Sequence, residues 1–230
     1  MSDAPVSRTV SDTKRDFFAA YPRPINSVFR RVVDELLVEV HLLVNNEEFR
    51  YDPLFAIGLI TAFQAFMENY RPAEQREVIL QALCSSLKLD LGKMQQDVSE
   101  WRKLAELPSQ EVLEVMVGTR EPSPGSLSVV RDTWSGIAGS ENYKYSRIFA
   151  IGLANIVEQV ARSAQMSEKD RLEKLQQICT FLKVDYARVK RDLDLFVATL
   201  DKVRRSKEVV DEIAAADRRK QDERAASTPT

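Results

Sequence analysis

Residues 51–59 read YDPLFAIGL and residues 145–153 read YSRIFAIGL, so one apolar pattern occurs twice in the chain. A second pair follows: residues 83–97 read LCSSLKLDLGKMQQD, and residues 178–192 read ICTFLKVDYARVKRD. Similar segments at a long, regular interval are typical of a chain built from related supersecondary units. Each FAIGL segment is apolar on nearly all sides, which is typical of a buried helix. The two pairs therefore predict an all-α helical bundle built from two related helical halves.

The rest of the chain supports this fold class. Only 7 glycines and 9 prolines occur in 230 residues, and no segment alternates long enough to predict a strand. Whether the two halves share one core is left open by the sequence. The boundaries that we expect are a disordered N-terminus (1–10), a first helical half (11–118), a linker (119–125), a second half packing with the first (126–200), and a projecting polar C-terminal helix with a frayed tail (201–230).

Charge and hydropathy exclude several classes of protein. The 33 basic and 35 acidic residues nearly balance, so no general field attracts nucleic acid, and we expect no nucleic-acid partner. The longest apolar stretch covers only residues 54–67, whereas a membrane-spanning helix needs about 20 residues. The first residues, MSDAPVSRTVSDTKRD, have no apolar core and resemble neither a signal peptide nor a good transit peptide. These features predict a protein without a membrane span that acts in the compartment where it is made or on a membrane surface facing that compartment.

Residues for catalysis or metal binding are scarce, and we expect no enzyme activity, no cofactor and no metal. His41 is the only histidine and lies within an apolar helical pattern, so a structural role is favoured over catalysis. Cys84 and Cys179 occupy matching positions in the two copies and are expected to be small buried residues, although a disulfide between them stays open. Gly58 and Gly152, inside the FAIGL segments, are expected to permit close contact between helices.

Two surfaces are candidates for binding a partner. The first is the turn Tyr21–Pro24, where Tyr21 and Arg23 precede Arg30 and Arg31 on the next helix. Two prolines make this turn rigid, and an aromatic residue beside positive charge could form a contact surface. The alternative is an ordinary helix connection with a solvated basic flank.

The second candidate surface is the C-terminal helix. Apolar residues recur along it at coiled-coil-like spacing, namely Val189, Leu193, Phe196, Leu200, Val203 and Val210. Arg204 lies beside this apolar seam. The seam could pack on the protein's own body or bind a partner, and the spacing alone does not separate these possibilities. If the seam faces outward, Leu200→Asp or Val203→Asp should harm partner binding more than folding.

A family resemblance adds a functional expectation. The stretch TVSDTKRDFFAAYPRPINSVFRRVVDELLVEVHLL (residues 9–43), followed by FRYDPLFAIGLITAFQAFMENYRP (residues 49–72), resembles the thylakoid formation protein family, also called the photosystem II biogenesis protein family. The match is specific over residues 9–72 and looser elsewhere. The missing transit peptide is typical of a cyanobacterial member.

The resemblance implies a non-catalytic accessory factor for photosystem II biogenesis and repair. It implies partners among FtsH-type membrane protease complexes or photosystem II assembly intermediates, and a cytoplasmic location at the periphery of the thylakoid membrane. One alternative is a pigment- or lipid-binding carrier, with the ligand between the apolar helices at Phe55–Met67 and Phe149–Val157. The other alternative, an enzyme, would require perturbed acidic groups that converge in a cleft.

Overall fold

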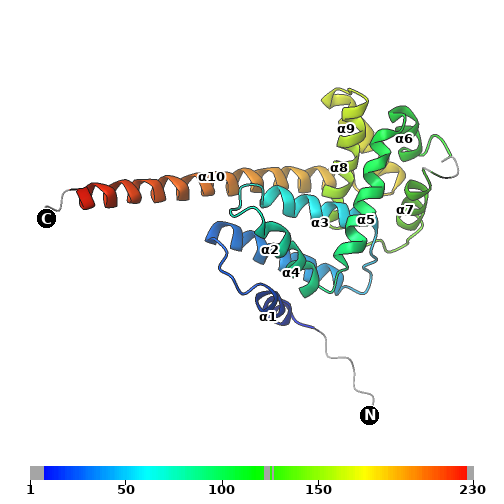
Figure 1. The fold of residues 1–230 in the computed structure, drawn as a ribbon. Helices are drawn as coiled ribbons and strands as arrows, with labels where there is room; N and C mark the ends of the chain where they lie inside the picture. Colours follow the sequence, from blue (N-terminus) through cyan, green and yellow to red (C-terminus); the bar gives the residue numbers. More distant parts are fainter. Residues whose placement is uncertain (1–7, 122–124, 126, 227–230) are drawn as a thin grey trace, which may run out of the picture.

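A computed structural model describes residues 8–121, 125 and 127–226 and shows an all-α protein, which confirms the expected fold class. No strand occurs among these described residues. The helices are α1 (Val10–Ala20), α2 (Ser27–Val44), α3 (Pro53–Phe66), α4 (Gln75–Ser86), α5 (Leu91–Arg102), the short 3₁₀ helix η1 (Lys103–Glu106), α6 (Ser109–Met116), α7 (Ser128–Ala138), α8 (Arg147–Ser163), α9 (Glu168–Phe181) and α10 (Tyr186–Ala226). Figure 1 shows nine α-helices gathered into a body, from which α10 extends as a long arm.

The first helix begins earlier than the sequence predicts. Val10 is already helical, because Thr9 caps α1 together with Asp12. The Thr9 hydroxyl accepts a hydrogen bond from the Asp12 backbone N–H at 3.1 Å, and the Asp12 carboxylate accepts one from the Thr9 N–H at 3.1 Å. This reciprocal pair is a capping box, in which aspartate takes the place of the usual glutamate. Thr9 and Val10, which were expected to be disordered, are thus ordered, and residues 1–7 lie outside the described part.

The two copies of the FAIGL segment pack directly against each other as α3 and α8. A Cβ atom added to Gly58 would lie 1.8 Å from the backbone oxygen of Ile148, and one added to Gly152 would lie 2.0 Å from the backbone oxygen of Leu54. The backbones can approach this closely only because both positions lack a side chain. The expected role of these two glycines in helix contact is confirmed.

Equivalent residues of the two copies also make equivalent contacts. The Tyr51 hydroxyl donates a hydrogen bond to Asp97 at 2.6 Å, and the Tyr145 hydroxyl donates one to Asp192 at 2.7 Å. A basic group lies 4.4 Å from each ring centroid, Lys93 over Tyr51 and Arg188 over Tyr145. These matching contacts support the interpretation that the chain contains two related halves.

A single hydrophobic core joins the two parts of the chain. Its buried residues run from Phe17 in α1 to Val189 in α10 without a break into separate clusters. The rings of Trp101 and Trp134, from α5 and α7, stack with their centroids 5.4 Å apart. The Tyr143 hydroxyl donates a hydrogen bond to Asp52, the N-terminal cap of α3, at 2.9 Å. Contacts between sequence-distant helices therefore hold α3 to α8 and α5 to α7.

The expected linker (119–125) is only partly visible, since residues 122–124 lie outside the described part. Its first residues are held against α6. The Thr119 N–H donates to the Glu114 carbonyl at 2.9 Å, and Arg120 lies 3.2 Å from Glu111 and 3.6 Å from Glu114.

Over the described residues, no helix is both long enough and apolar enough to cross a membrane.

Candidate functional site

The long helix α10 is the feature that sets this fold apart, and it has an inner and an outer part. Its 41 residues correspond to about 60 Å at 1.5 Å per residue. Val189 is fully buried, Leu193 and Val203 pack against the core, and Phe196 meets Phe66 of α3 with ring centroids 5.3 Å apart. Beyond this packed part the helix leaves the body and ends far from it (Figure 1).

This arrangement decides the question that the apolar seam left open. The seam faces the body as far as Val203. Leu200→Asp and Val203→Asp were expected to harm partner binding more than folding only if the seam faced outward, and this condition is not met. The packed part also extends past residue 200, the expected end of the second half. The coiled-coil-like spacing arises because α10 lies along the body. Residues 227–230, the expected frayed tail, lie outside the described part.

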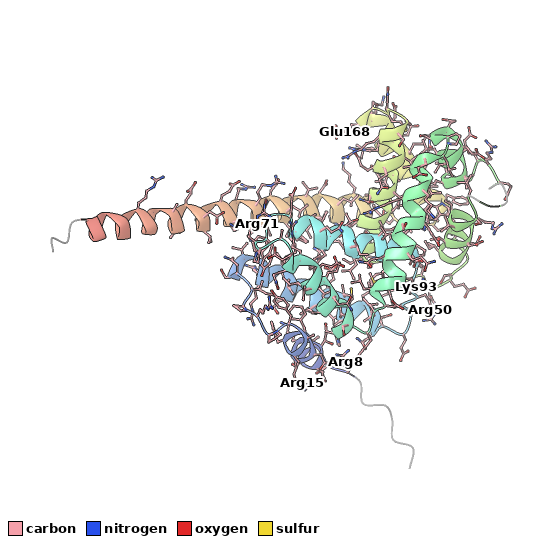
Figure 2. All side chains as sticks on the ribbon, in the orientation of Figure 1. Arg8, Arg15, Arg50, Arg71, Lys93 and Glu168 are labelled. Atoms are coloured by element: carbon pink, nitrogen blue, oxygen red, sulfur yellow. The ribbon has the colours of Figure 1, made fainter. Side chains whose placement is uncertain are left out.

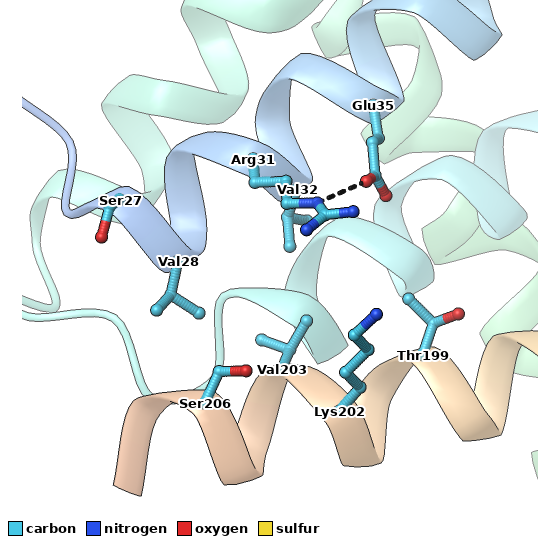
Figure 3. A pocket seen from close by; sticks show the side chains of 9 residues that line it. All are labelled: Ser27, Val28, Arg31, Val32, Glu35, Thr199, Lys202, Val203 and Ser206. Atoms are coloured by element: carbon cyan, nitrogen blue, oxygen red, sulfur yellow. Dashed lines mark hydrogen bonds and ion pairs between the residues drawn. The ribbon is translucent and has the colours of Figure 1, made fainter. Parts of the chain in front are cut away.

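A groove of about 400 Å³ opens where α10 crosses the start of α2. Its lining combines three valines, three hydroxyl groups, two basic side chains and one carboxylate. They are Ser27, Val28, Arg31, Val32 and Glu35 of α2 and Thr199, Lys202, Val203 and Ser206 of α10. Figure 3 shows Lys202 and Thr199 pointing from α10 toward α2, with Arg31 and Glu35 on the facing helix. The groove thus brings together residues from both candidate surfaces, Arg31 from the first and Val203 from the second.

The charges at the groove are unevenly paired. Arg31 Nε lies 3.1 Å from Glu35 Oε1, so this guanidinium has one carboxylate partner. Lys202 Nζ has no carboxylate partner among the described residues. Of the neighbouring cations on α10, Arg204 lies 3.6 Å from Asp201, and Lys207 pairs with Asp211 one turn further on. Lys202 is therefore a positive charge available to a bound anion.

Beyond the groove, α10 carries exposed apolar side chains. Val209 is 54% exposed and Ile213 57% exposed, whereas Val210 between them is half-buried. Single exposed apolar residues are ordinary on protein surfaces. A pair one turn apart on a helix that has left its body forms a short apolar stripe without an internal partner.

The first candidate surface needs a correction at Tyr21. This residue is only 2% exposed, because its ring packs in the core near Phe17, and its hydroxyl donates to Gln75 Oε1 at 3.2 Å. Tyr21 is therefore a core residue and cannot present its ring to a partner. Arg30 and Arg31 are exposed but locally engaged: the Arg30 guanidinium lies 4.4 Å from the Phe18 ring centroid, and Arg31 pairs with Glu35. Arg23 is exposed.

We expect Val203→Asp to loosen α10 from the body. The substitution places a carboxylate at a half-buried apolar contact, which should lower the free energy of unfolding by about 1–3 kcal/mol. Hydrogen exchange should show the loss as faster exchange of backbone amides around residue 203. Val197→Asp is the matched control, because Val197 is 56% exposed on the same helix. Equal stability of the two variants would contradict the inward packing of the seam.

The other side chains that could serve in catalysis or metal binding are buried or hydrogen-bonded within the protein. The Thr13 hydroxyl and His41 Nδ1 lie 2.8 Å apart in the core, as expected for a structural histidine. Cys84 and Cys179 are free and buried, which settles the open disulfide question, and burial raises the pKa of each thiol to about 12. Burial also raises the pKa of Asp52. In the described part of the chain, no group of three or more His, Cys, Asp and Glu side chains could hold a metal ion.

Many surface charges in the described part of the chain pair with a neighbouring charge of opposite sign. Figure 2 shows Arg8 and Arg15 near α1 at one end of the body and Glu168 of α9 at the other end. Many of these charges pair locally, such as Arg15 with Asp12 at 2.9 Å and Lys93 with Asp97 at 2.7 Å. Interleaved charges of both signs are not the electrostatic footprint of a nucleic-acid-binding protein.

The proposed ligand position between the FAIGL helices is filled by protein. At Gly58 and Gly152 the backbones of α3 and α8 approach too closely for a pigment or lipid to lie between them. The adjoining side chains, Phe55 and Phe149 among them, are buried in the core. The contact between these helices thus argues against the carrier alternative at this position.

Sequence reasoning found the two helices of the groove but missed that they form one site. Ser27, Thr199 and Ser206 carried no signal, because a hydroxyl residue on a helix is ordinary in any sequence. Only the crossing of α2 and α10 brings these hydroxyls beside Arg31 and Lys202. A signal that could have been used is the run KVRRSK at residues 202–207, where basic residues gather beside the seam.

A family model, curated relatives and a solved structure all place this chain in the same family. The family model described as thylakoid formation protein matches residues 9–225. A protein called Thf1 from Gloeobacter violaceus is 63% identical over 96% of this chain and 98% of its own length, and Thf1 from Synechocystis is 38% identical over 96% and 91%. A solved structure of Psb29 superposes with a TM-score of 0.76 at 35% identity and covers 93% of this chain and 98% of its own. The chain therefore belongs to the thylakoid formation protein family, and membership implies a role in thylakoid formation and photosystem II biogenesis.

Proposed function

We propose that this protein is a non-catalytic accessory factor that binds and stabilises FtsH-type membrane protease complexes at the thylakoid surface, and thereby supports photosystem II biogenesis and repair. The observation that carries the proposal is the arm formed by the outer part of α10 (Figure 1), on which the apolar side chains of Val209 and Ile213 are more than half exposed. A helix with an unpartnered apolar stripe is a common means of binding another protein.

Stabilisation by binding requires no chemistry from this protein. A partner that binds only the assembled protease lowers the free energy of the assembled state, and the gain grows with the concentration of the partner. The rigid body and its long arm suit this role, because α10 is held along the body through Val189, Phe196 and Val203. This packing fixes where the arm leaves the body, so little orientational freedom is lost when the outer part of α10 binds a partner.

Peripheral attachment to the membrane belongs to the same proposal. In this proposal, contact with the thylakoid membrane comes through the protein complex that the chain binds. Photosystem II assembly intermediates are a second possible partner, and they would be recognised by the same exposed stripe on α10.

Replacing the exposed stripe should weaken partner binding without unfolding the body. We expect the double variant Val209→Asp, Ile213→Asp to lose most of its capture of FtsH-type subunits, about tenfold, because two apolar contacts become charged. The measurement is a pull-down of tagged full-length protein with detergent-solubilised thylakoid membranes, followed by quantitative mass spectrometry. The thermal unfolding temperature should stay close to that of the unmodified chain.

Val197→Asp serves as the control, because Val197 is equally exposed on α10 but lies beside the body. Its capture of the protease should equal that of the unmodified chain. Recovery of the unmodified protein alone, with intact protease complexes in the flow-through, would refute direct binding. Full capture by the double variant would refute the role of the outer part of α10.

A further inference from the structure

We infer that the groove between α2 and α10 is a second docking position, which receives an acidic segment of the partner: an apolar side chain next to a carboxylate. This inference rests on the proposed function, because the segment would belong to the same protein complex. The groove is the place where the arm leaves the body, so a partner that follows α10 toward the body must reach it.

The lining of the groove fits such a segment. Val28, Val32 and Val203 supply an apolar surface, and hydroxyl groups of Ser27, Thr199 and Ser206 can donate or accept hydrogen bonds to a peptide backbone. The volume of about 400 Å³ accommodates a few side chains rather than a whole helix. An apolar anchor with polar groups around it is the usual composition of a peptide-binding groove.

Charge decides which polar groups the segment carries. Arg31 and Lys202 face each other across the groove, and only Arg31 has a carboxylate partner, Glu35. Arg205 Nε donates a hydrogen bond to the Asp201 carbonyl of its own helix at 3.3 Å, and no carboxylate in the described part of the chain pairs with it. A partner carboxylate near Lys202 would therefore gain a charge-assisted hydrogen bond without breaking an existing ion pair.

The charge distribution along α10 gives the partner a direction. Residues 201–207 contain four basic side chains and one acidic one, whereas residues 208–212 contain three acidic side chains and no basic one. An acidic segment is attracted to the groove and repelled from the next turn and a half of the helix. Complementary charges of this kind set register and orientation more than affinity.

An anionic lipid headgroup is the competing occupant, and the geometry favours a protein. The two cations project from opposite walls into a concave groove, whereas a membrane surface contacts charges that share one convex face. Glu35 also lies in the groove, where its carboxylate would repel a layer of phosphates. A peptide can place one carboxylate at Lys202 and keep its other groups away from Glu35.

The test reverses one charge. Tagged full-length Lys202→Glu should capture about tenfold less FtsH-type protease from detergent-solubilised thylakoid membranes than the unmodified chain, because an attraction becomes a repulsion. Lys202→Arg should retain capture. Lys190→Glu is the matched control, since it makes the same change in net charge at an exposed position of α10 outside the groove. Added salt should weaken capture by the unmodified chain more than capture by Lys202→Glu.

Each outcome separates the groove from the proposed function. Normal capture by Lys202→Glu would overturn the inference and leave the proposed function standing, and an equal loss in Lys190→Glu would overturn it as a general charge effect. No capture by the unmodified chain would overturn both. Vesicles of phosphatidylglycerol test the lipid: if Lys202→Glu loses sedimentation with these vesicles but captures the protease normally, the groove binds a headgroup and the inference is wrong.

Discussion

Gly58→Ala is expected to lower the free energy of unfolding by about 3–5 kcal/mol, a large effect for a single methyl group. The added Cβ would lie 1.8 Å from the Ile148 carbonyl oxygen and 2.8 Å from its carbon, and both atoms belong to the backbone of α8. A flexible side chain could move aside, but a helix backbone can yield only by moving the whole helix. Urea denaturation and the thermal unfolding temperature measure the change.

Gly152→Ala should have a similar effect, because its Cβ would meet the Leu54 carbonyl oxygen at 2.0 Å. The control is Gly136→Ala in α7, where nothing lies within 4 Å of the added Cβ. Alanine is the better helix former, so this variant should keep or raise the stability by up to about 1 kcal/mol. Unchanged stability in Gly58→Ala would contradict the close approach of α3 and α8.

The second large effect is expected at Trp101, which is 1% exposed and stacks on Trp134 between α5 and α7. Trp101→Ala should lower the free energy of unfolding by about 3–5 kcal/mol, because it removes a large buried side chain and leaves a cavity. This stack joins parts of the chain on either side of the residues 122–124, so its loss should loosen α7 in particular. Hydrogen exchange of the α7 amides and urea denaturation measure both effects.

Replacement by phenylalanine separates ring packing from hydrogen bonding at this stack. Trp101 Nε1 is buried with no hydrogen-bond partner among the described residues, whereas Trp134 Nε1 donates to the Met116 carbonyl at 2.8 Å. Trp101→Phe should therefore cost about 1 kcal/mol and Trp134→Phe about 2 kcal/mol, because only the second leaves a buried carbonyl unpaired. Since the chain has 2 tryptophans, each variant keeps one fluorescent reporter. A larger loss in Trp101→Phe would contradict this assignment of the hydrogen bonds.

The local features of this protein follow from nearby residues and could be predicted. Helix starts at Asp52 and Ser146 follow from side chains that accept a hydrogen bond three residues later. At Thr9 the capping box was not predicted, because it uses aspartate instead of glutamate. As a result, α1 begins at Val10, one residue before the expected start at residue 11. Glycine inside an apolar helix indicated a close contact, although the sequence did not say with which helix.

Long-range placement could not be predicted, and the candidate site depends on it. Tyr21 reads as a surface residue because it adjoins two prolines and arginines, yet its ring is buried against Phe17 of the preceding helix. The seam of α10 has the same spacing whether it faces a partner or its own body, because the helical repeat fixes only which residues share a face.

The sequence by itself determined the all-α class, the two matching segments and the small residues at the helix contact. Each of these depends on residues that are close together in the chain. The tertiary structure alone decided that α3 meets α8, that α10 packs on the body as far as Val203, and that Arg31 and Lys202 face each other across one groove. The physical reason is that side-chain spacing specifies which face of a helix is apolar, whereas the partner of that face is chosen by the packing of the whole core.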